Sequence, residues 1–144
     1  YDIKLVHEKI LRIYSLLILK FIKKPHFYLN NPIKQKNSIA TFNPKRKPKD
    51  GLINWNDKFR KINNLVRALK KPWPGAYFIE NDKIIFVWNI KVRSDFKKFK
   101  ITRGKFFTWN KKKIIKCKDR FLELEDFSIK KINKKLIKIY EIQN

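Results

Sequence analysis

A short loop rich in cations is the part of the sequence best suited to bind an anion. It spans residues 44–51, reads Pro-Lys-Arg-Lys-Pro-Lys-Asp-Gly, and holds four basic residues: Lys45, Arg46, Lys47 and Lys49. Its two prolines restrict the backbone, so the loop can meet a phosphate without a large ordering cost. Lysine and arginine form strong, charge-assisted hydrogen bonds with phosphate oxygens. We therefore expect Lys45, Arg46 and Lys47 to contact a phosphate-bearing substrate.

Two further side chains, Arg67 and Trp73, are candidates for contact with a substrate. Arg67 carries a planar guanidinium group that suits a carboxylate or a phosphate. The simpler alternative, which we favour, is that it fastens the linker by pairing with Asp50 or Asp57. Trp73 lies in a Pro-Trp-Pro-Gly turn at 72–75, where two prolines and a glycine fix the direction of the indole ring. That turn either packs a helix onto the following domain or presents Trp73 to a ligand.

The sequence shows no pattern for catalysis, for a metal or for a tightly held cofactor. Three glycines, widely spaced, leave no glycine-rich phosphate loop. The one cysteine, Cys117, has no histidine near it in sequence to act as its base. No cluster of His, Cys, Asp and Glu has the spacing of a metal site. The sequence therefore predicts no catalytic, cofactor-binding or metal-binding residue in this chain.

The chain is strongly basic, with 37 Lys and Arg against 12 Asp and Glu and a formal charge of +25. Such a field attracts phosphates, nucleic acid or anionic lipid. Alanine, however, occurs only at positions 40, 68 and 76, while Lys, Ile, Asn and Phe abound. This is the profile of an AT-rich coding sequence, which places lysine at any solvated position. Polyanion binding and codon bias are both compatible with the charge.

Composition also bears on the compartment and on the completeness of the chain. A single cysteine excludes an internal disulfide and fits a reducing, cytoplasmic location. The most apolar run, 16–22, is interrupted by Lys20 and is far shorter than the roughly 20 residues that a membrane span needs. The opening Tyr-Asp-Ile-Lys is unlike a signal peptide. Because the chain contains no methionine, we expect it to be a fragment of a longer protein that begins upstream.

Apolar spacing predicts one long helix and then a linker. From residue 3 to residue 24 apolar residues recur at intervals of three and four, as in an amphipathic helix: Ile3, Val6, Ile10, Ile13, Leu17 and Phe21. Pro25 should stop this helix, since proline cannot continue the backbone ladder. The following residues carry three prolines and no sustained period, which indicates an extended linker.

The second half of the chain reads as a helix followed by short strands. A helix begins at Asn56 or Asp57, either of which could cap it, and runs to Leu69. Beyond Gly75 the period changes to two, and polar turns separate five expected strands at 76–79, 83–92, 104–109, 113–118 and 121–124. Five short strands favour a small antiparallel barrel of the oligonucleotide-binding (OB) type. The predicted fold class is α+β.

Two segments of the chain carry a family resemblance. Residues 40–55 read Ala-Thr-Phe-Asn-Pro-Lys-Arg-Lys-Pro-Lys-Asp-Gly-Leu-Ile-Asn-Trp, and residues 63–77 read Asn-Asn-Leu-Val-Arg-Ala-Leu-Lys-Lys-Pro-Trp-Pro-Gly-Ala-Tyr. They resemble the carboxyl-terminal part of the 10-formyltetrahydrofolate-dependent formyltransferases. That family includes methionyl-tRNA formyltransferase and the formyltransferases of amino-sugar nucleotides. The resemblance is strong from 35 to 78 and rests on pattern alone in the strands that follow.

The resemblance leans toward one branch of this family. The loop at 44–51 is similar to the Pro-x-Arg-x-Pro-x-Asp-Gly of the sugar-nucleotide branch, whereas the tRNA branch reads more like Ala-x-Lys-Ile before an Ile-Asp-Trp. Asn54 departs from both branches, which commonly have Asp there. Two alternatives stay open: the tRNA-binding domain of a methionyl-tRNA formyltransferase, and a stand-alone basic module that binds nucleic acid through lysines and aromatic side chains.

The resemblance also implies a domain organisation. Residues 1–25 would be the last helix of an otherwise missing catalytic domain, 26–55 a linker, and 56–144 the carboxyl-terminal domain of helix and barrel. In this family an Asn, a His and an Asp run the formyl transfer, with the His in a His-Pro-Ser-Leu-Leu-Pro segment. His7 and His26 lack that context, so we expect both to be structural or exposed.

The partners implied by the resemblance follow from the same reaction. The formyl donor, 10-formyltetrahydrofolate, would be bound by the missing catalytic domain and not by this chain. The acceptor would be an amino-sugar nucleotide or an initiator tRNA. The chain would work beside its own catalytic domain, and a homodimer is an open alternative.

Overall fold

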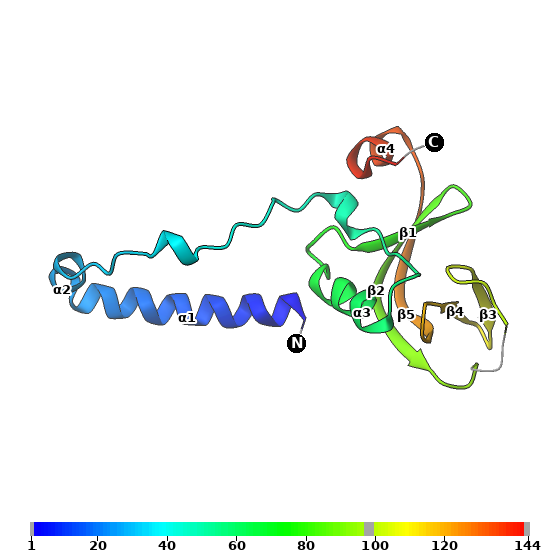
Figure 1. Ribbon diagram of the computed structural model, residues 1–144, viewed down its shortest axis with the longest axis horizontal. Helices are drawn as coiled ribbons and strands as arrows, with labels where there is room; N and C mark the ends of the chain where they lie inside the picture. The colour runs from blue at the N-terminus through cyan, green and yellow to red at the C-terminus, as the bar shows by residue number, and fades with distance from the viewer. Residues whose placement is uncertain (1, 97–99, 143–144) are drawn as a thin grey trace. The chain divides into compact units, whose positions relative to one another are not determined.

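The computed structural model describes residues 2–96 and 100–142, which fall into two compact units. The first holds residues 3–46 and the second begins at residue 47. Helices occupy the first unit, and the second combines helices with an antiparallel sheet. Figure 1 shows these elements in order along the chain. The predicted α+β class is confirmed.

The first unit consists of two helices and an extended segment. Helix α1 covers Ile3–Lys23, as the apolar spacing predicts, and α2 covers Pro25–Asn30. Pro25 therefore ends α1 but also starts α2, because a helix does not need the N–H of its first residue. The rings of Phe21 and Tyr28 lie 6.1 Å apart at this corner. Helical turns thus interrupt the segment that the sequence predicts to be extended.

Five antiparallel strands form the sheet of the second unit, in the order β1-β2-β5-β4-β3. Their bounds are Ala76–Glu80 for β1, Lys83–Arg93 for β2, Phe106–Trp109 for β3, Lys112–Lys116 for β4 and Phe121–Lys131 for β5. In the part of the chain that the structure describes, no ladder joins β1 to β3, so the hydrogen-bonded sheet is open. Closure into an OB-like barrel stays a prediction.

Two tight hairpin turns, β1 to β2 and β3 to β4, lie where the sequence places polar residues. Asn81 and Asp82 join β1 to β2 with φ of 47° and 54°, and Asn110 and Lys111 join β3 to β4 with φ of 47° and 63°. Two consecutive residues with positive φ match the twist of the flanking strands, and Asn and Asp tolerate that conformation. These turns fix the register of both hairpins.

The end of the chain differs from the prediction. Strand β5 continues to Lys131, although the sequence pattern ends the strand at Leu124, and α4 follows at Lys134–Tyr140. Asn133 caps α4, because its side chain accepts a hydrogen bond from the Leu136 N–H at 2.9 Å. The extra length of β5 comes from pairing with the equally long β2, which local alternation does not reveal.

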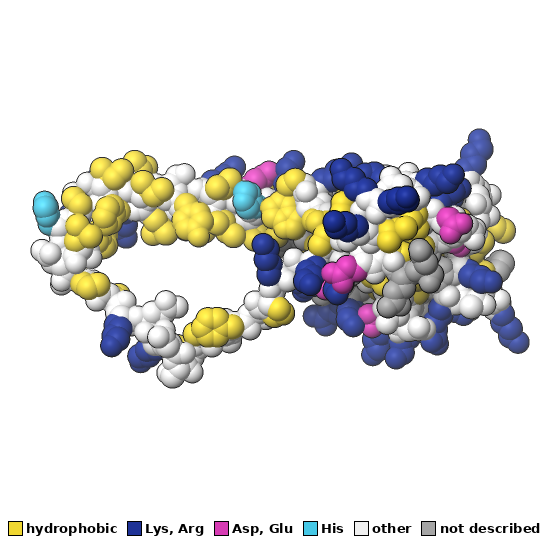
Figure 2. Space-filling model, turned by 90° about the horizontal axis from the view of Figure 1, so that it is seen from above, with side chains coloured by type: hydrophobic (Ala, Val, Ile, Leu, Met, Phe, Trp, Pro, Cys, Tyr) yellow, Lys and Arg dark blue, Asp and Glu magenta, His cyan; other side chains and the backbone are white. Residues whose placement is uncertain are grey.

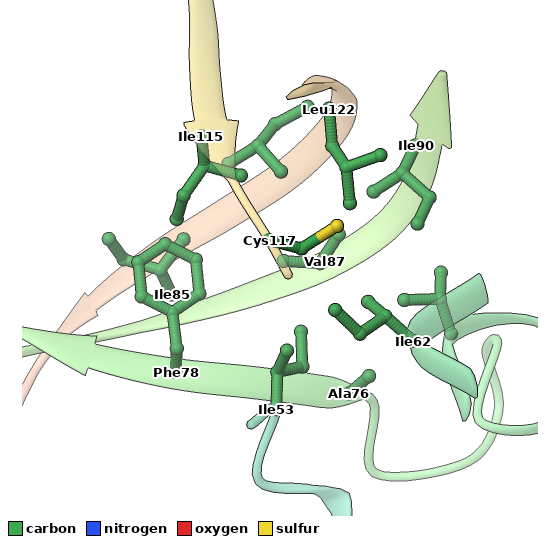
Figure 3. Close-up of a cluster of buried hydrophobic side chains, with 12 residues drawn as sticks. Ile53, Ile62, Ala76, Phe78, Ile85, Val87, Ile90, Ile115, Cys117 and Leu122 are labelled. Atoms are coloured by element: carbon green, nitrogen blue, oxygen red, sulfur yellow. The ribbon is translucent and has the colours of Figure 1, made fainter. Parts of the chain in front are cut away.

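One face of the sheet and helix α3 (Phe59–Ala68) enclose the main hydrophobic core (Figure 3). From α3, Ile62 and Val66 are buried against strand residues that include Val87 and Leu122. Ile53, from the segment before the helix, is buried in the same cluster. Burial of these side chains supplies most of the energy that holds α3 on the sheet.

Helix α3 begins later than predicted. The sequence suggests a cap at Asn56 or Asp57, but Lys58 is the N-cap and forms no side-chain cap. Instead Asp119, which is distant in sequence, accepts a hydrogen bond from the Phe59 N–H at 2.8 Å. This bond lowers the pKa of Asp119 below its ordinary value. A tertiary contact thus replaces the local cap.

A buried carboxylate, Glu123, is neutralised by two cations at the centre of the sheet. Its Oε1 accepts from Lys112 Nζ at 2.8 Å and its Oε2 accepts from Arg93 Nη1 at 2.7 Å. Arg93 also pairs with Asp95. The hydrogen bonds from Lys112 and Arg93 hold the pKa of Glu123 below its ordinary 4.5. The carboxylate therefore stays ionised although its residue is only 5% exposed.

Replacing Glu123 by Gln should destabilise the fold in a pH-dependent way. Because the folded-state pKa of Glu123 is depressed, its contribution is present above about pH 4.5 and is lost as the pH falls through the folded-state value. We expect E123Q to lower the free energy of unfolding by about 1–3 kcal/mol at pH 7. Urea unfolding at pH 7 and pH 3 measures this difference. An equal deficit at both pH values would contradict the assignment.

The thiol of Cys117 should be inert in the folded chain. Cys117 is fully buried, and burial raises the pKa of its thiol, so little reactive thiolate is present at pH 7. We expect Ellman's reagent to label it slowly in the native state and at once in 6 M guanidinium. A stoichiometric burst of labelling in native buffer would show that the core around Cys117 is open.

Candidate anion-binding site

The basic loop of the sequence contains a tight turn at Pro48–Gly51. The Lys47 N–H donates to Asp50 Oδ2 at 2.7 Å, and the Asp50 N–H donates to the Lys47 carbonyl at 3.0 Å. Pro48 suits the first position of such a turn because its φ is already fixed. These two bonds set the backbone that carries Lys47 and Lys49.

The turn is attached to the edge of the sheet through its glycine. A Cβ on Gly51 would lie 2.7 Å from the carbonyl oxygen of Gly75, so no side chain fits between the two backbones. The next residues run along β1, where the Ile53 N–H donates to the Tyr77 carbonyl at 2.7 Å. The basic turn therefore has a fixed position relative to β1.

Helix α4 brings a carboxylate to this turn. Tyr140, the last residue of α4, is buried, with its ring 4.8 Å from the ring of Tyr77 and 5.7 Å from that of Phe86. Its hydroxyl lies 3.4 Å from the Pro74 carbonyl, to which it donates. Glu141 follows as the C-cap with a φ of 51°, a left-handed conformation that turns the chain out of the helix. Tyr140 thus fixes where Glu141 lies.

Two lysines of the turn converge on Glu141. Lys49 Nζ forms an ion pair and hydrogen bond with Glu141 Oε2, and Lys47 Nζ lies 3.8 Å from Glu141 Oε1. The hydrogen bond raises the pKa of Lys49 and lowers that of Glu141. About half of the Lys49 and Glu141 side-chain area is exposed. The arrangement is an accessible pair of cations that already holds one carboxylate.

The structure places the predicted site residues in different surroundings. Lys45 and Arg46 are exposed at the end of the first unit, and Lys47 opens the second. Trp73 lies in the turn before β1, about one-third exposed, and this turn contains the Gly75 that meets Gly51. Of these residues, Lys47 lies at the Glu141 carboxylate. The sequence places Lys49 in the basic loop but does not single it out as a contact, and it gives no sign of a role for Glu141.

Arg67 lies in the last turn of α3 and is half-buried. The two carboxylates that the sequence suggests as its partners are engaged with other groups. Asp50 accepts from the Lys47 N–H, and Asp57 pairs with Lys61 at 3.0 Å. The pairing of Arg67 with either residue stays a prediction, as does its contact with a substrate.

A second basic location is an open hollow of about 440 Å³ beside the start of α3. Its lining includes Lys58, Arg60 and Lys118, and also Lys61, which is paired with Asp57. Figure 2 shows Lys and Arg side chains over much of the visible face of the second unit, with few carboxylates among them. The basic character is thus spread over this face, and the turn at 47–49 differs by its fixed geometry.

The described residues hold no group of three or more His, Cys, Asp and Glu that could bind a metal. His7 and His26 are exposed on α1 and α2. In the described part of the chain, no helix is long and apolar enough to cross a membrane. What the second unit offers chemically is a set of exposed cations, two of which, Lys47 and Lys49, lie at one carboxylate.

Comparison with known proteins gives the chain a family. The family model described as "Formyl transferase, C-terminal domain" matches residues 45–144. Over 94 residues the chain is 43% identical to the bifunctional polymyxin resistance protein ArnA of Wigglesworthia glossinidia brevipalpis, and the match covers 65% of this chain. It covers only 14% of that relative, so the chain spans a small part of the relative's length.

A solved structure supports the fold. A multiply substituted variant of HypX from Aquifex aeolicus matches with a TM-score of 0.57 over 81% of this chain and 20% of its own, at 18% sequence identity. At that identity the likeness concerns the fold alone. Because the family model covers the basic turn, α3, the whole sheet and α4, the chain belongs to the family of formyl transferase C-terminal domains.

Proposed function

We propose that this chain handles the substrate of a 10-formyltetrahydrofolate-dependent formyltransferase that acts on an amino-sugar nucleotide. Family membership supports the reaction class. One observation carries the choice of substrate: Lys47 and Lys49 converge on a single carboxylate in an exposed, fixed turn. Paired cations of this kind suit the diphosphate of a nucleotide sugar. The similarity of the loop at 44–51 to the sugar-nucleotide branch points the same way.

The role of the chain in such a reaction is binding and orientation. In formyl transfer the substrate amine attacks the formyl carbon of 10-formyltetrahydrofolate, and tetrahydrofolate leaves. We assign that step and the donor to a catalytic domain with its own Asn, His and Asp, outside this chain. The basic turn would hold the phosphates so that the amine reaches the donor, which reduces the entropic cost of the encounter. The net charge of +25 would speed the approach of an anionic substrate.

The same proposal implies a cellular compartment and an assembly for the whole protein. A folate-dependent formyltransferase works where folate and nucleotide sugars are made, and the free, buried Cys117 fits the reducing cytoplasm. A homodimer remains compatible with this role. We also retain closure of the five strands into an OB-like barrel as part of the proposal.

Removing two cations of the loop should weaken substrate binding without changing the chemical step. In the intact enzyme we expect R46A/K47A to raise KM for the nucleotide sugar about three- to tenfold and to leave kcat nearly unchanged. The double variant K34A/K36A, which removes two exposed lysines from the extended segment, is the charge-matched control. An unchanged KM in R46A/K47A would refute the assignment of the loop.

The charge favours initiator tRNA as a second candidate substrate. If the chain serves a methionyl-tRNA formyltransferase, initiator tRNA should bind clearly tighter than bulk tRNA at about 150 mM salt, where non-specific phosphate contacts are weakened. Filter binding with both RNAs measures this ratio. Equal affinities would exclude a tRNA-specific role. A steep linear fall of log affinity with log salt, with no dependence on folate, would instead indicate a general nucleic-acid-binding module.

A further inference from the structure

We propose that Lys47 and Lys49 form a phosphate seat that Glu141 fills in the absence of ligand, and that a diphosphate binds there by displacing the Glu141 side chain. This inference rests on the function proposed above and adds to it a competing role for Glu141. The carboxylate of Glu141 serves as the stand-in for the ligand, since its two oxygens face the two ammonium groups.

The geometry of the seat suits a larger anion than a carboxylate. Lys49 Nζ forms a close ion pair with one oxygen, while Lys47 Nζ lies 3.8 Å from the other, beyond hydrogen-bond distance. A phosphate offers more acceptor oxygens and more charge, so it can satisfy both ammonium groups at once. Asp50 stands in the same turn, but its carboxylate accepts from the Lys47 N–H and so stabilises the turn.

Displacement requires only one side chain to move. Glu141 is about half exposed, as is Lys49, and exposed ion pairs contribute little to stability. The backbone on both sides of the seat is fixed, by the burial of Tyr140 at the end of α4 and by the contact of Gly51 with Gly75. The backbone that carries the two lysines therefore stays in place when the carboxylate leaves.

An internal carboxylate gives the seat selectivity. A chain with a formal charge of +25 attracts every anion in solution. A monovalent anion gains no more from the two lysines than Glu141 already does, and it lacks the advantage of being tethered. A diphosphate is not tethered either, but its higher charge can make its binding stronger than that of Glu141. Glu141 thus discriminates against weaker anions at the cost of some affinity for the true ligand.

Titration of the full 144-residue chain with inorganic pyrophosphate, followed by calorimetry at constant salt, tests the proposal. We expect E141Q to bind pyrophosphate about two- to fivefold more tightly than the unmodified chain, because it removes the competing charge. The matched control is E125Q, an exposed glutamate on β5 that accepts from Asn89 Nδ2. It makes the same change in net charge and should leave the affinity nearly unchanged.

A coupling experiment separates the seat from general electrostatics. K47Q/K49Q should weaken pyrophosphate binding, and adding E141Q to that variant should have no further effect. Equal tightening by E141Q and E125Q, or an E141Q effect that persists without the two lysines, would overturn the inference.

The same titrations distinguish failure of the inference from failure of the proposed function. If K47Q/K49Q weakens binding and R46A/K47A raises KM while E141Q has no effect, the loop binds substrate and only the competition by Glu141 is wrong. If pyrophosphate binding is insensitive to K47Q/K49Q and KM is unchanged in R46A/K47A, the substrate assignment fails as well.

Discussion

The pairing of β2 with β5 is the interaction on which the rest of the second unit depends. The two strands are the longest in the sheet, and their register runs from Lys83 opposite Lys131 to Arg93 opposite Phe121. Both faces of this pair are covered. On one face Val87 and Leu122 pack with α3, and on the other Phe86 packs with the end of α4. Since the site elements attach to these faces and to β1 beside them, loss of this pairing would release the basic turn.

The few acidic residues determine which cations of this basic chain are paired within the fold. Asp119 caps α3, Glu123 neutralises Arg93 and Lys112, and Glu141 pairs with the two lysines of the basic turn. Lysines are abundant at the surface, so their positions alone carry little information. The positions of carboxylates, by contrast, mark where charge must be balanced, and the turn at 47–49 is such a place.

Local patterns predicted the parts of the fold that local forces determine. The period of the apolar residues gave α1 and most of α3, and Asn at 81 and 110 marked the two tight turns. Contacts between residues far apart in the sequence could not be predicted from local patterns. The Asp119 cap of α3 is one case, and another is the ion pair between Lys49 and Glu141, which are 92 positions apart. Helix α4 was missed because it is short and is held by burial of Tyr140.

The contact between Gly51 and Gly75 has a consequence for how this sequence can change. Gly75 has a φ of 93°, and a Cβ there would lie 2.7 Å from the indole ring of Trp88, while a Cβ on Gly51 would meet the Gly75 carbonyl. When a sequence drifts toward a lysine- and asparagine-rich composition, most solvated positions can be substituted with little loss of stability. These two positions are closed to that drift, because the Gly75 carbonyl occupies the space that a side chain on Gly51 would need and the Trp88 ring occupies the space that a side chain on Gly75 would need.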